Sequence, residues 1–223
     1  YRRQRQMCIR DRTYNNEYAY TFASWLVRAQ YSYKGRYMVS ASIRGDGSSR
    51  FAPNTRWGYF PAASVGWRVS DESFLRDVKW IDDLKLRLSV GVTGNAQIGN
   101  SEYLQLYGST NIDLGNGLRP QVYPSQIANP DLGPETLNNY EVGGTFYIFR
   151  NLSLAPSFYY AEGKDFLYYV ATGEKLWGKQ DIYQRQNISK VHVKGVEADL
   201  NYNASFGLAV NVNSVSYTHL RAH

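Results

Sequence analysis

Cysteine and histidine are both scarce in this chain. Its 223 residues include one cysteine, Cys8, and three histidines. A single cysteine excludes an internal disulfide framework and a zinc site built from several thiolates. His192 is the only histidine between residues 13 and 213, and no serine or aspartate can be assigned to it as a catalytic partner. The composition therefore gives no support for an enzyme, a cofactor or a metal centre.

Long hydrophobic runs are also missing. No stretch approaches the roughly 18 apolar residues that a membrane-spanning helix requires. Aromatic residues are abundant, with 20 Tyr, 9 Phe and 5 Trp. A transmembrane β-barrel has both properties, because its strands alternate apolar and polar residues and its rims carry aromatic girdles. The negative mean hydropathy is therefore compatible with a membrane protein of this kind.

The excess of positive charge lies at the two ends of the sequence. The formal net charge is +6. Residues 1–12 carry five Arg and one Asp, and residues 214–223 carry one Arg, so these flanks contribute +5 of that charge. The central part is nearly neutral and gives no basis for nucleic-acid binding.

Both flanks resemble translated adaptor sequence. Residues 6–12, QMCIRDR, match the translation of a transposase adaptor used in sequencing libraries, and residues 214–223, SVSYTHLRAH, resemble the translation of its partner strand. We therefore expect residues 1–12 and 214–223 to be adaptor-derived, and we exclude them from the fold assignment. Residues 13–213 are expected to be part of one barrel domain.

The clearest pattern lies in residues 37–69. Apolar and aromatic residues alternate with small or charged residues in 37–44 and again in 59–69, which predicts two strands joined by a polar loop, residues 45–57. At about 3.3 Å per residue and a tilt of about 45°, ten to twelve residues span about 25 Å, the height of a lipid-facing band. Soluble sandwiches use shorter strands, so the pattern favours a membrane barrel.

The same period of two predicts more strands along the chain. They are residues 22–33, 84–92, 140–148, 152–160, 191–202 and 208–212, with a short strand expected at 166–170. About eight strands would form an antiparallel meander, with short periplasmic turns and long outer loops over 94–138 and 163–186. Ser70 as an N-cap predicts a short helix before residue 82. A change in the parity of apolar residues predicts a β-bulge at Lys194 and Gly195.

Three blocks of sequence resemble the SusC/RagA family of TonB-dependent outer-membrane transporters. They are residues 44–100, which begin RGDGSSRFAPNTRWGYF, residues 129–136, NPDLGPET, and residues 194–202, KGVEADLNY. Three separated blocks in order are more specific than one short motif. The resemblance covers most of residues 36–205 and implies an all-β fold, part of a barrel of about 22 strands closed around a plug.

The resemblance also implies a function and partners. The protein would lie in the lipid of the outer membrane and import oligosaccharides or peptides. TonB would supply the energy, and a SusD-like surface lipoprotein would deliver the substrate. The alternative is a small, complete eight-stranded barrel that acts as an adhesin or a passive pore.

Candidate ligand contacts fall into two groups. Polar strand residues expected to face the lumen are Lys85, Arg87, Glu141, Lys194, Glu197 and Asp199, and His192 is expected there as well. Aromatic residues in the outer loops that can stack on sugar rings are Tyr103, Tyr107, Tyr123, Trp177 and Tyr183. The alternative for the first group is a structural role in the barrel wall, and the alternative for the second group is packing within the loops.

Three short motifs have weaker functional interpretations. Residues 44–46 spell the adhesion tripeptide Arg-Gly-Asp, but a strand end followed by a turn explains them better. Asp82 and Asp83 are neighbours in a strand and point to opposite faces, which argues against paired acid–base catalysis. Asp113, Asn116 and Gly117 lack the full spacing of an EF-hand calcium loop.

Overall fold

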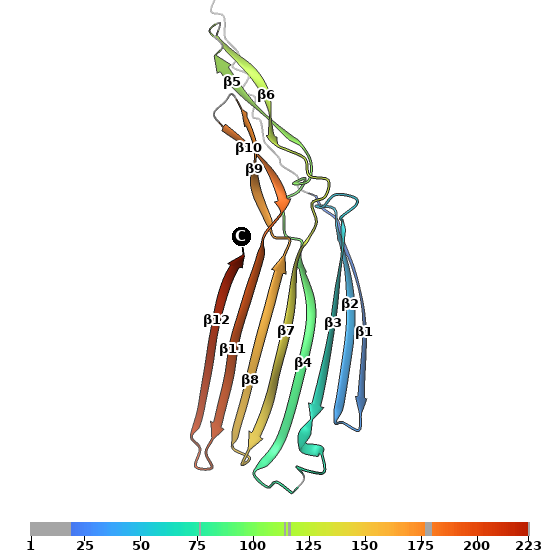
Figure 1. Ribbon diagram of the computed structural model, residues 1–223, viewed down its shortest axis with the longest axis vertical. Coiled ribbons are helices and arrows are strands. Elements are labelled where there is room, and N and C mark those ends of the chain that lie inside the picture. The colour runs from blue at the N-terminus through green and yellow to red at the C-terminus, as the bar shows by residue number, and fades with distance from the viewer. Residues whose placement is uncertain (1–18, 76, 114, 116, 177–179, 223) are drawn as a thin grey trace, which may run out of the picture.

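An antiparallel sheet of eight long strands dominates the computed structural model, which describes residues 19–75, 77–113, 115, 117–176 and 180–222. The strand order is β1-β2-β3-β4-β7-β8-β11-β12 (Figure 1). Their bounds are Phe22–Tyr33 (β1), Tyr37–Ser48 (β2), Trp57–Arg68 (β3), Ile81–Asn95 (β4), Glu135–Ile148 (β7), Leu152–Lys164 (β8), Lys190–Asn203 (β11) and Ala209–Ala222 (β12). The predicted all-β meander is confirmed.

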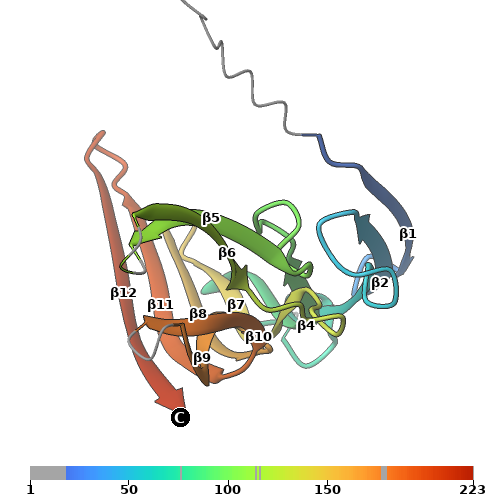
Figure 2. The same ribbon diagram turned by 90° about the horizontal axis from the view of Figure 1, so that it is seen from above.

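The eight strands form an open arc when seen from above (Figure 2). β1 and β12 lie at the two ends of the arc, and no pairing joins them in the described part of the chain. These strands therefore do not close into a small eight-stranded barrel, which was the alternative architecture.

β12 extends into the C-terminal flank. Residues 214–222 pair with β11 in an uninterrupted register. The other flank, residues 1–12, lies outside the described residues. The adaptor origin of both flanks stays a prediction.

β2 extends to Ser48, four residues beyond the strand end that the sequence pattern predicts. β2 includes Gly45 and Gly47, which were expected in a loop. A Cβ atom on Gly45 would lie 2.4 Å from Nε1 of Trp25, and one on Gly47 would lie 2.9 Å from Cε2 of Trp57. The prediction of a loop from residue 45 was wrong because these glycines give room to indole rings rather than forming a turn.

The described residues of the connection between β3 and β4 form no α-helix, so the helix predicted there is not observed. The connection contains one 3₁₀ turn, η1 (Val69–Asp71), followed by turns. The Ser70 hydroxyl donates a hydrogen bond to Asp83 Oδ1 at 2.8 Å, so Ser70 does not act as an N-cap. Among the described residues, no helix is long and apolar enough to cross a membrane.

Glu72 anchors this connection to the ends of the strands. Its carboxylate accepts hydrogen bonds from the Tyr37 hydroxyl at 2.5 Å and from the Trp67 indole N–H at 3.2 Å. A guanidinium nitrogen of Arg36 lies 3.6 Å from the same carboxylate. The hydrogen bond from Tyr37 is the main cause that lowers the pKa of the Glu72 carboxyl.

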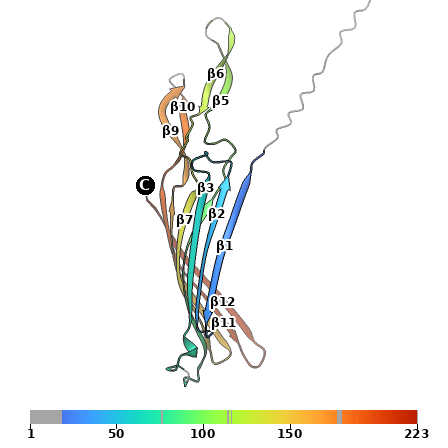
Figure 3. The same ribbon diagram turned by 90° about the vertical axis from the view of Figure 1, so that its right-hand side faces the viewer.

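Two shorter hairpins rise above one end of the sheet (Figures 1 and 3). They are β5 (Leu106–Asp113) with β6 (Leu118–Gln126), and β9 (Leu167–Leu176) with β10 (Gln180–Asn187). Three of the four connections at the opposite end are turns of three to five residues. Outer-membrane barrels place short turns on the periplasmic side, so we take the hairpin end as extracellular. The expectation of an irregular stretch over 94–138 was wrong, since this stretch contains the β5–β6 hairpin. Pro120 and Pro124 in β6 interrupt the alternation by which a strand is recognised in the sequence.

The main buried cluster lies at the base of these hairpins and not in the sheet. Its members are Phe51, Ile98, Leu132 and Leu167, and Phe51 and Leu132 are fully buried. The sheet carries few buried side chains, since in a barrel wall one face meets lipid and the other meets the lumen.

Asparagine side chains tie the hairpins to this base. The Asn187 amide donates to the carbonyls of Gly133 and Asp165 at 2.9 and 2.8 Å, and its oxygen accepts the N–H of Gly133 at 2.9 Å. The Asn129 amide donates to the carbonyl of Arg185 at 2.7 Å. These bonds satisfy backbone groups that no strand partner reaches, so they hold β10 against residues 129–133.

Candidate functional site

The pairing registers sort the strand residues onto two faces, because directly paired residues share a face. One row across the sheet contains Tyr31, Val39, Val65, Leu88, Val142 and Phe158. The next row contains Gln30, Ser40, Ser64, Ser89 and Glu141. We call the apolar face the outer face, since it suits lipid, and the polar face the inner face, since it suits a water-filled lumen.

Five of the six predicted lumen residues lie on the inner face. Lys85, Arg87 and Glu141 share it on β4 and β7, and Glu197 and Asp199 share it on β11. Arg87 Nη2 lies 2.5 Å from Glu141 Oε1, so these two form an ion pair across neighbouring strands. The β11 pair lies two strands beyond β7, so the five residues line a wall rather than a single pocket. Their contact with a ligand stays a prediction.

Lys194 and His192 lie on the outer face instead. β11 pairs with both of its neighbours without a register shift through Lys194 and Gly195, so the predicted bulge was wrong. Without a bulge, Lys194 and His192 share the face of Val196. The Nδ1 atom of His192 lies 2.8 Å from the Tyr160 hydroxyl. The apolar alternation changes at residue 194 because the outer face carries the polar residues His192 and Lys194 at its extracellular end.

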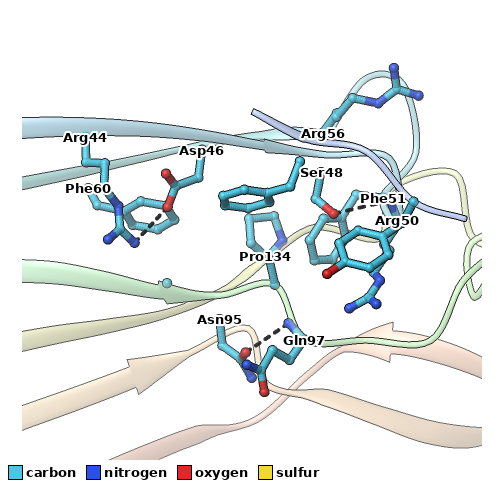
Figure 4. Close-up of a pocket in the computed structure, with 14 residues that line it drawn as sticks. Arg44, Asp46, Ser48, Arg50, Phe51, Arg56, Phe60, Asn95, Gln97 and Pro134 are labelled. Carbon is cyan, nitrogen blue, oxygen red and sulfur yellow. Dashed lines mark hydrogen bonds and ion pairs between the residues drawn. The ribbon is translucent and has the colours of Figure 1, made fainter. Parts of the chain in front are cut away.

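A pocket of about 320 Å³ opens at the extracellular end of β2, β3 and β4 (Figure 4). Its walls combine three arginines, Arg44, Arg50 and Arg56, with the rings of Phe51 and Phe60. Sequence reasoning did not select it as a binding site. The signal that could have indicated it is the close spacing of the three arginines in one polar segment.

The polar groups of this pocket are only partly paired. Arg44 Nη2 lies 2.7 Å from Asp46 Oδ2, and the Arg50 guanidinium lies 3.9 Å from the Tyr20 ring centroid. Arg56 Nε and Asp46 Oδ1 are buried and have no hydrogen-bond partner among the described residues. One donor and one acceptor of the lining are therefore buried without a partner among the described residues. Such a site suits a polar ligand that also has apolar faces.

The predicted loop aromatics do not converge on one site. Tyr103 packs against the buried cluster. Tyr107 and Tyr123 lie on opposite faces of the β5–β6 hairpin. Tyr183 is exposed on β10, and Trp177 lies outside the described residues. Their role in ligand binding stays a prediction.

The acidic residues singled out in the sequence have separate partners. Asp82 accepts a hydrogen bond from a backbone N–H in the β7–β8 turn, whereas Asp83 accepts one from Ser70. Asp113 accepts two backbone N–H groups within its own turn, at 2.9 and 3.2 Å. Asn116 lies outside the described residues. Over the part of the chain that is described, no three His, Cys, Asp or Glu side chains group as they would around a metal ion.

Sequence comparison identifies related proteins. The family model described as TonB dependent receptor-like, beta-barrel matches residues 3–222. TonB-dependent receptor P39 of Formosa agariphila is 35% identical over 208 residues, covering 88% of this chain and 19% of P39. TonB-dependent receptor SusC of Bacteroides thetaiotaomicron is 47% identical over 88 residues, covering 39% of this chain and 9% of SusC. The matched part therefore spans less than a fifth of either relative.

Structure comparison gives the same fold. The RagAB peptide importer in its open-open state has a TM-score of 0.77 and 24% identity, covering 92% of this chain and 22% of that chain. The siderophore receptor PirA of Pseudomonas aeruginosa has a TM-score of 0.63 and 16% identity, covering 91% and 35%. The family match, the relatives and the fold together show that this chain belongs to the TonB-dependent receptors, as part of a SusC/RagA-like outer-membrane β-barrel.

Proposed function

We propose that this chain forms one sector of the wall and extracellular mouth of a transporter that imports oligosaccharides or peptides. The observation that carries the proposal is the polar inner face, which leads along β2 to β4 to the pocket of Arg44, Arg50 and Arg56. Sugars and peptides both need hydrogen-bond donors and acceptors along their route. Both also offer apolar faces that can contact the exposed rings of Tyr20 and Phe22, which line the same pocket.

We further propose that the transporter works with TonB and with a SusD-like surface lipoprotein. The β5–β6 hairpin supports the second partner, because it projects furthest from the sheet (Figure 1). It exposes Tyr107, Leu118 and Val122, which are 65%, 72% and 71% accessible. Apolar side chains exposed together above the membrane suit contact with another protein.

An uptake assay tests the proposal. The full-length receptor that contains this segment is expressed in cells lacking its own copy, and uptake of fluorescent oligosaccharides and peptides is measured. Arg56→Ala removes the unpaired donor of the pocket and should lower uptake by about fivefold or more, the effect of losing one hydrogen bond to a ligand. Lys175→Ala is the control, since Lys175 is a basic residue exposed on β9, outside both the pocket and the β5–β6 hairpin.

Two results would contradict the proposal. Uptake that persists after deletion of TonB would indicate a passive pore. Cells that adhere to surfaces but take up none of these compounds would indicate an adhesin.

A further inference from the structure

Charged side chains occur at only one place on the outer face of the described sheet. Glu162 and Lys164 lie there at the end of β8, and Lys190, His192 and Lys194 lie beside them at the start of β11. The residues that pairing places on the outer face of β1 to β4 and of β7 include no acidic residue, basic residue or histidine. We call these five residues the rim cluster.

The rim cluster lies at the depth of the outer-leaflet headgroups. The outer-face pairs of β8 and β11 run from Leu152 and Tyr202 at the periplasmic end to Lys164 and Lys190. These twelve steps cover about 40 Å of strand, or about 28 Å of height at a tilt of about 45°. An apolar band of about 25 Å therefore ends close to Glu162. Lys164 and Lys190 lie beyond that level and meet headgroups rather than hydrocarbon. Lys194 is level with Tyr160, at a height of about 19 Å, and its ammonium group reaches the headgroups through the length of its side chain.

The cluster is net positive. Glu162 is paired with Lys164, whose Nζ lies 3.1 Å from Oε2. Lys190 and Lys194 are exposed, and no carboxylate of the described residues lies within 4.0 Å of either ammonium group. One carboxylate thus faces three ammonium groups, and a further anion would balance the charge.

A row of rings lies level with Lys194 and on the membrane side of Lys164 and Lys190. The centroids of Tyr140 and Tyr160 lie 6.1 Å apart, and His192 stacks on Tyr160 at 6.0 Å with an interplanar angle of 16°. The hydrogen bond between His192 and Tyr160 fixes this stack. Tyrosines at this height form the aromatic girdle of a barrel, which again places the lysines at the interface.

We propose that Lys164, Lys190 and Lys194 bind the phosphate of an outer-leaflet glycolipid. On the outside of a barrel wall at this depth, the available anions are lipid headgroups. Lysine binds phosphate as a compact point charge. β8 and β11 are paired directly with each other inside the sheet, so no further strand can separate the two halves of the cluster. The proposal needs only the membrane orientation and is independent of the transported substrate.

Lipid retention tests this proposal. The full-length receptor is stripped of lipid and placed in phosphatidylcholine nanodiscs that contain diphosphoryl lipid A or its dephosphorylated form. Native mass spectrometry then counts the lipid A molecules bound. The variant K164Q/K190Q/K194Q should retain about tenfold less diphosphoryl lipid A, since each lysine near an anionic headgroup contributes about fivefold at most. Binding of the dephosphorylated lipid should not change.

The matched control removes the same number of charges from the inner face. The variant R28Q/K85Q/R87Q should retain lipid A as the unmodified receptor does, because lipids do not reach the lumen. Equal losses in both variants, or full retention in the rim variant, would overturn the proposal. Displacement of lipid A by millimolar inorganic phosphate would also overturn it, because a free anion would then be the ligand.

Discussion

Gly45 shows how a single residue sets the geometry of the outer face. Its missing side chain leaves the space in which the Trp25 ring lies across the β1–β2 pair. The outer face thereby gains an indole at interface height without a break in the strand. Gly66, on β3, has more room, since the nearest atom to a Cβ added there would be Met38 Cε at 3.4 Å.

These two glycines should therefore respond differently to alanine. Gly45→Ala should destabilise the full-length receptor by about 1–3 kcal/mol, because the added methyl displaces the indole. Gly66→Ala should be neutral or stabilise by up to about 1 kcal/mol. Urea unfolding in lipid vesicles, followed by the heat-dependent mobility of the barrel on gels, measures both. Equal effects of the two variants would contradict this assignment of the Trp25 contact.

The Glu72 carboxyl should make stability depend on pH in the acidic range. Its pKa is lowered from 4.5, mainly by the Tyr37 hydrogen bond, so the folded state favours the carboxylate. The resulting stabilisation is present above about pH 4.5 and is lost as pH falls through the lower pKa of the folded state. Glu72→Gln should thus reduce stability at pH 7, and the difference from the unmodified receptor should narrow below pH 4.5.

Urea midpoints at pH 7 and at pH 3.5 measure this effect. Glu174→Gln is the matched control, because Glu174 is exposed on β9. A difference between Glu72→Gln and the unmodified receptor that stays constant over both pH values would show that the carboxylate is not responsible.

At the scale of the elements, the two hairpins depend on their shared base. Asn187 makes three hydrogen bonds to Gly133 and Asp165 there. Asn187→Ala should leave those backbone groups unpaired and loosen β9 and β10 by about 1–3 kcal/mol. Hydrogen exchange of residues 167–187 should become faster, while the long strands stay protected. Asn111→Ala on the other hairpin is the control, and equal acceleration in both variants would contradict this role.

Sequence reasoning succeeded where each face of a strand meets one uniform medium. The alternation in residues 22–33 predicted β1 with its observed bounds, because lipid selects apolar residues on one side throughout. The β5–β6 hairpin has no lipid-facing side, and its prolines interrupt the pattern, so it was missed. The parity change at Lys194 was taken for a bulge because sequence alone does not show the height at which lipid gives way to headgroups.

The candidate site was harder to predict than the strands. The pocket is lined by Arg56, Gln97 and Pro134, which come from three separate connections. Their proximity follows from the register of β2 to β4 and from the buried base, and local patterns contain neither. The five inner-face residues could be predicted, because their position depends only on alternation within one strand.

At the scale of the whole molecule, the open sheet has two unpaired edges. β1 and β12 expose backbone groups that another strand can bind. Residues 13–213 expressed alone should therefore form mixed oligomers in detergent, measured by sedimentation, with a mobility on gels that does not depend on heating. A single monomeric species with heat-dependent mobility would instead support the small closed barrel.

At the extracellular end, the buried cluster that stabilises the fold is separate from the exposed hairpins above it. Phe51 and Leu132 are enclosed beneath the hairpins, and β5, β6, β9 and β10 extend from that base as two separate two-stranded sheets. Segments at the tips can change in length and composition while the base and the wall stay the same. Foreign loops grafted between β5 and β6 or between β9 and β10 should therefore leave the eight-stranded sheet intact.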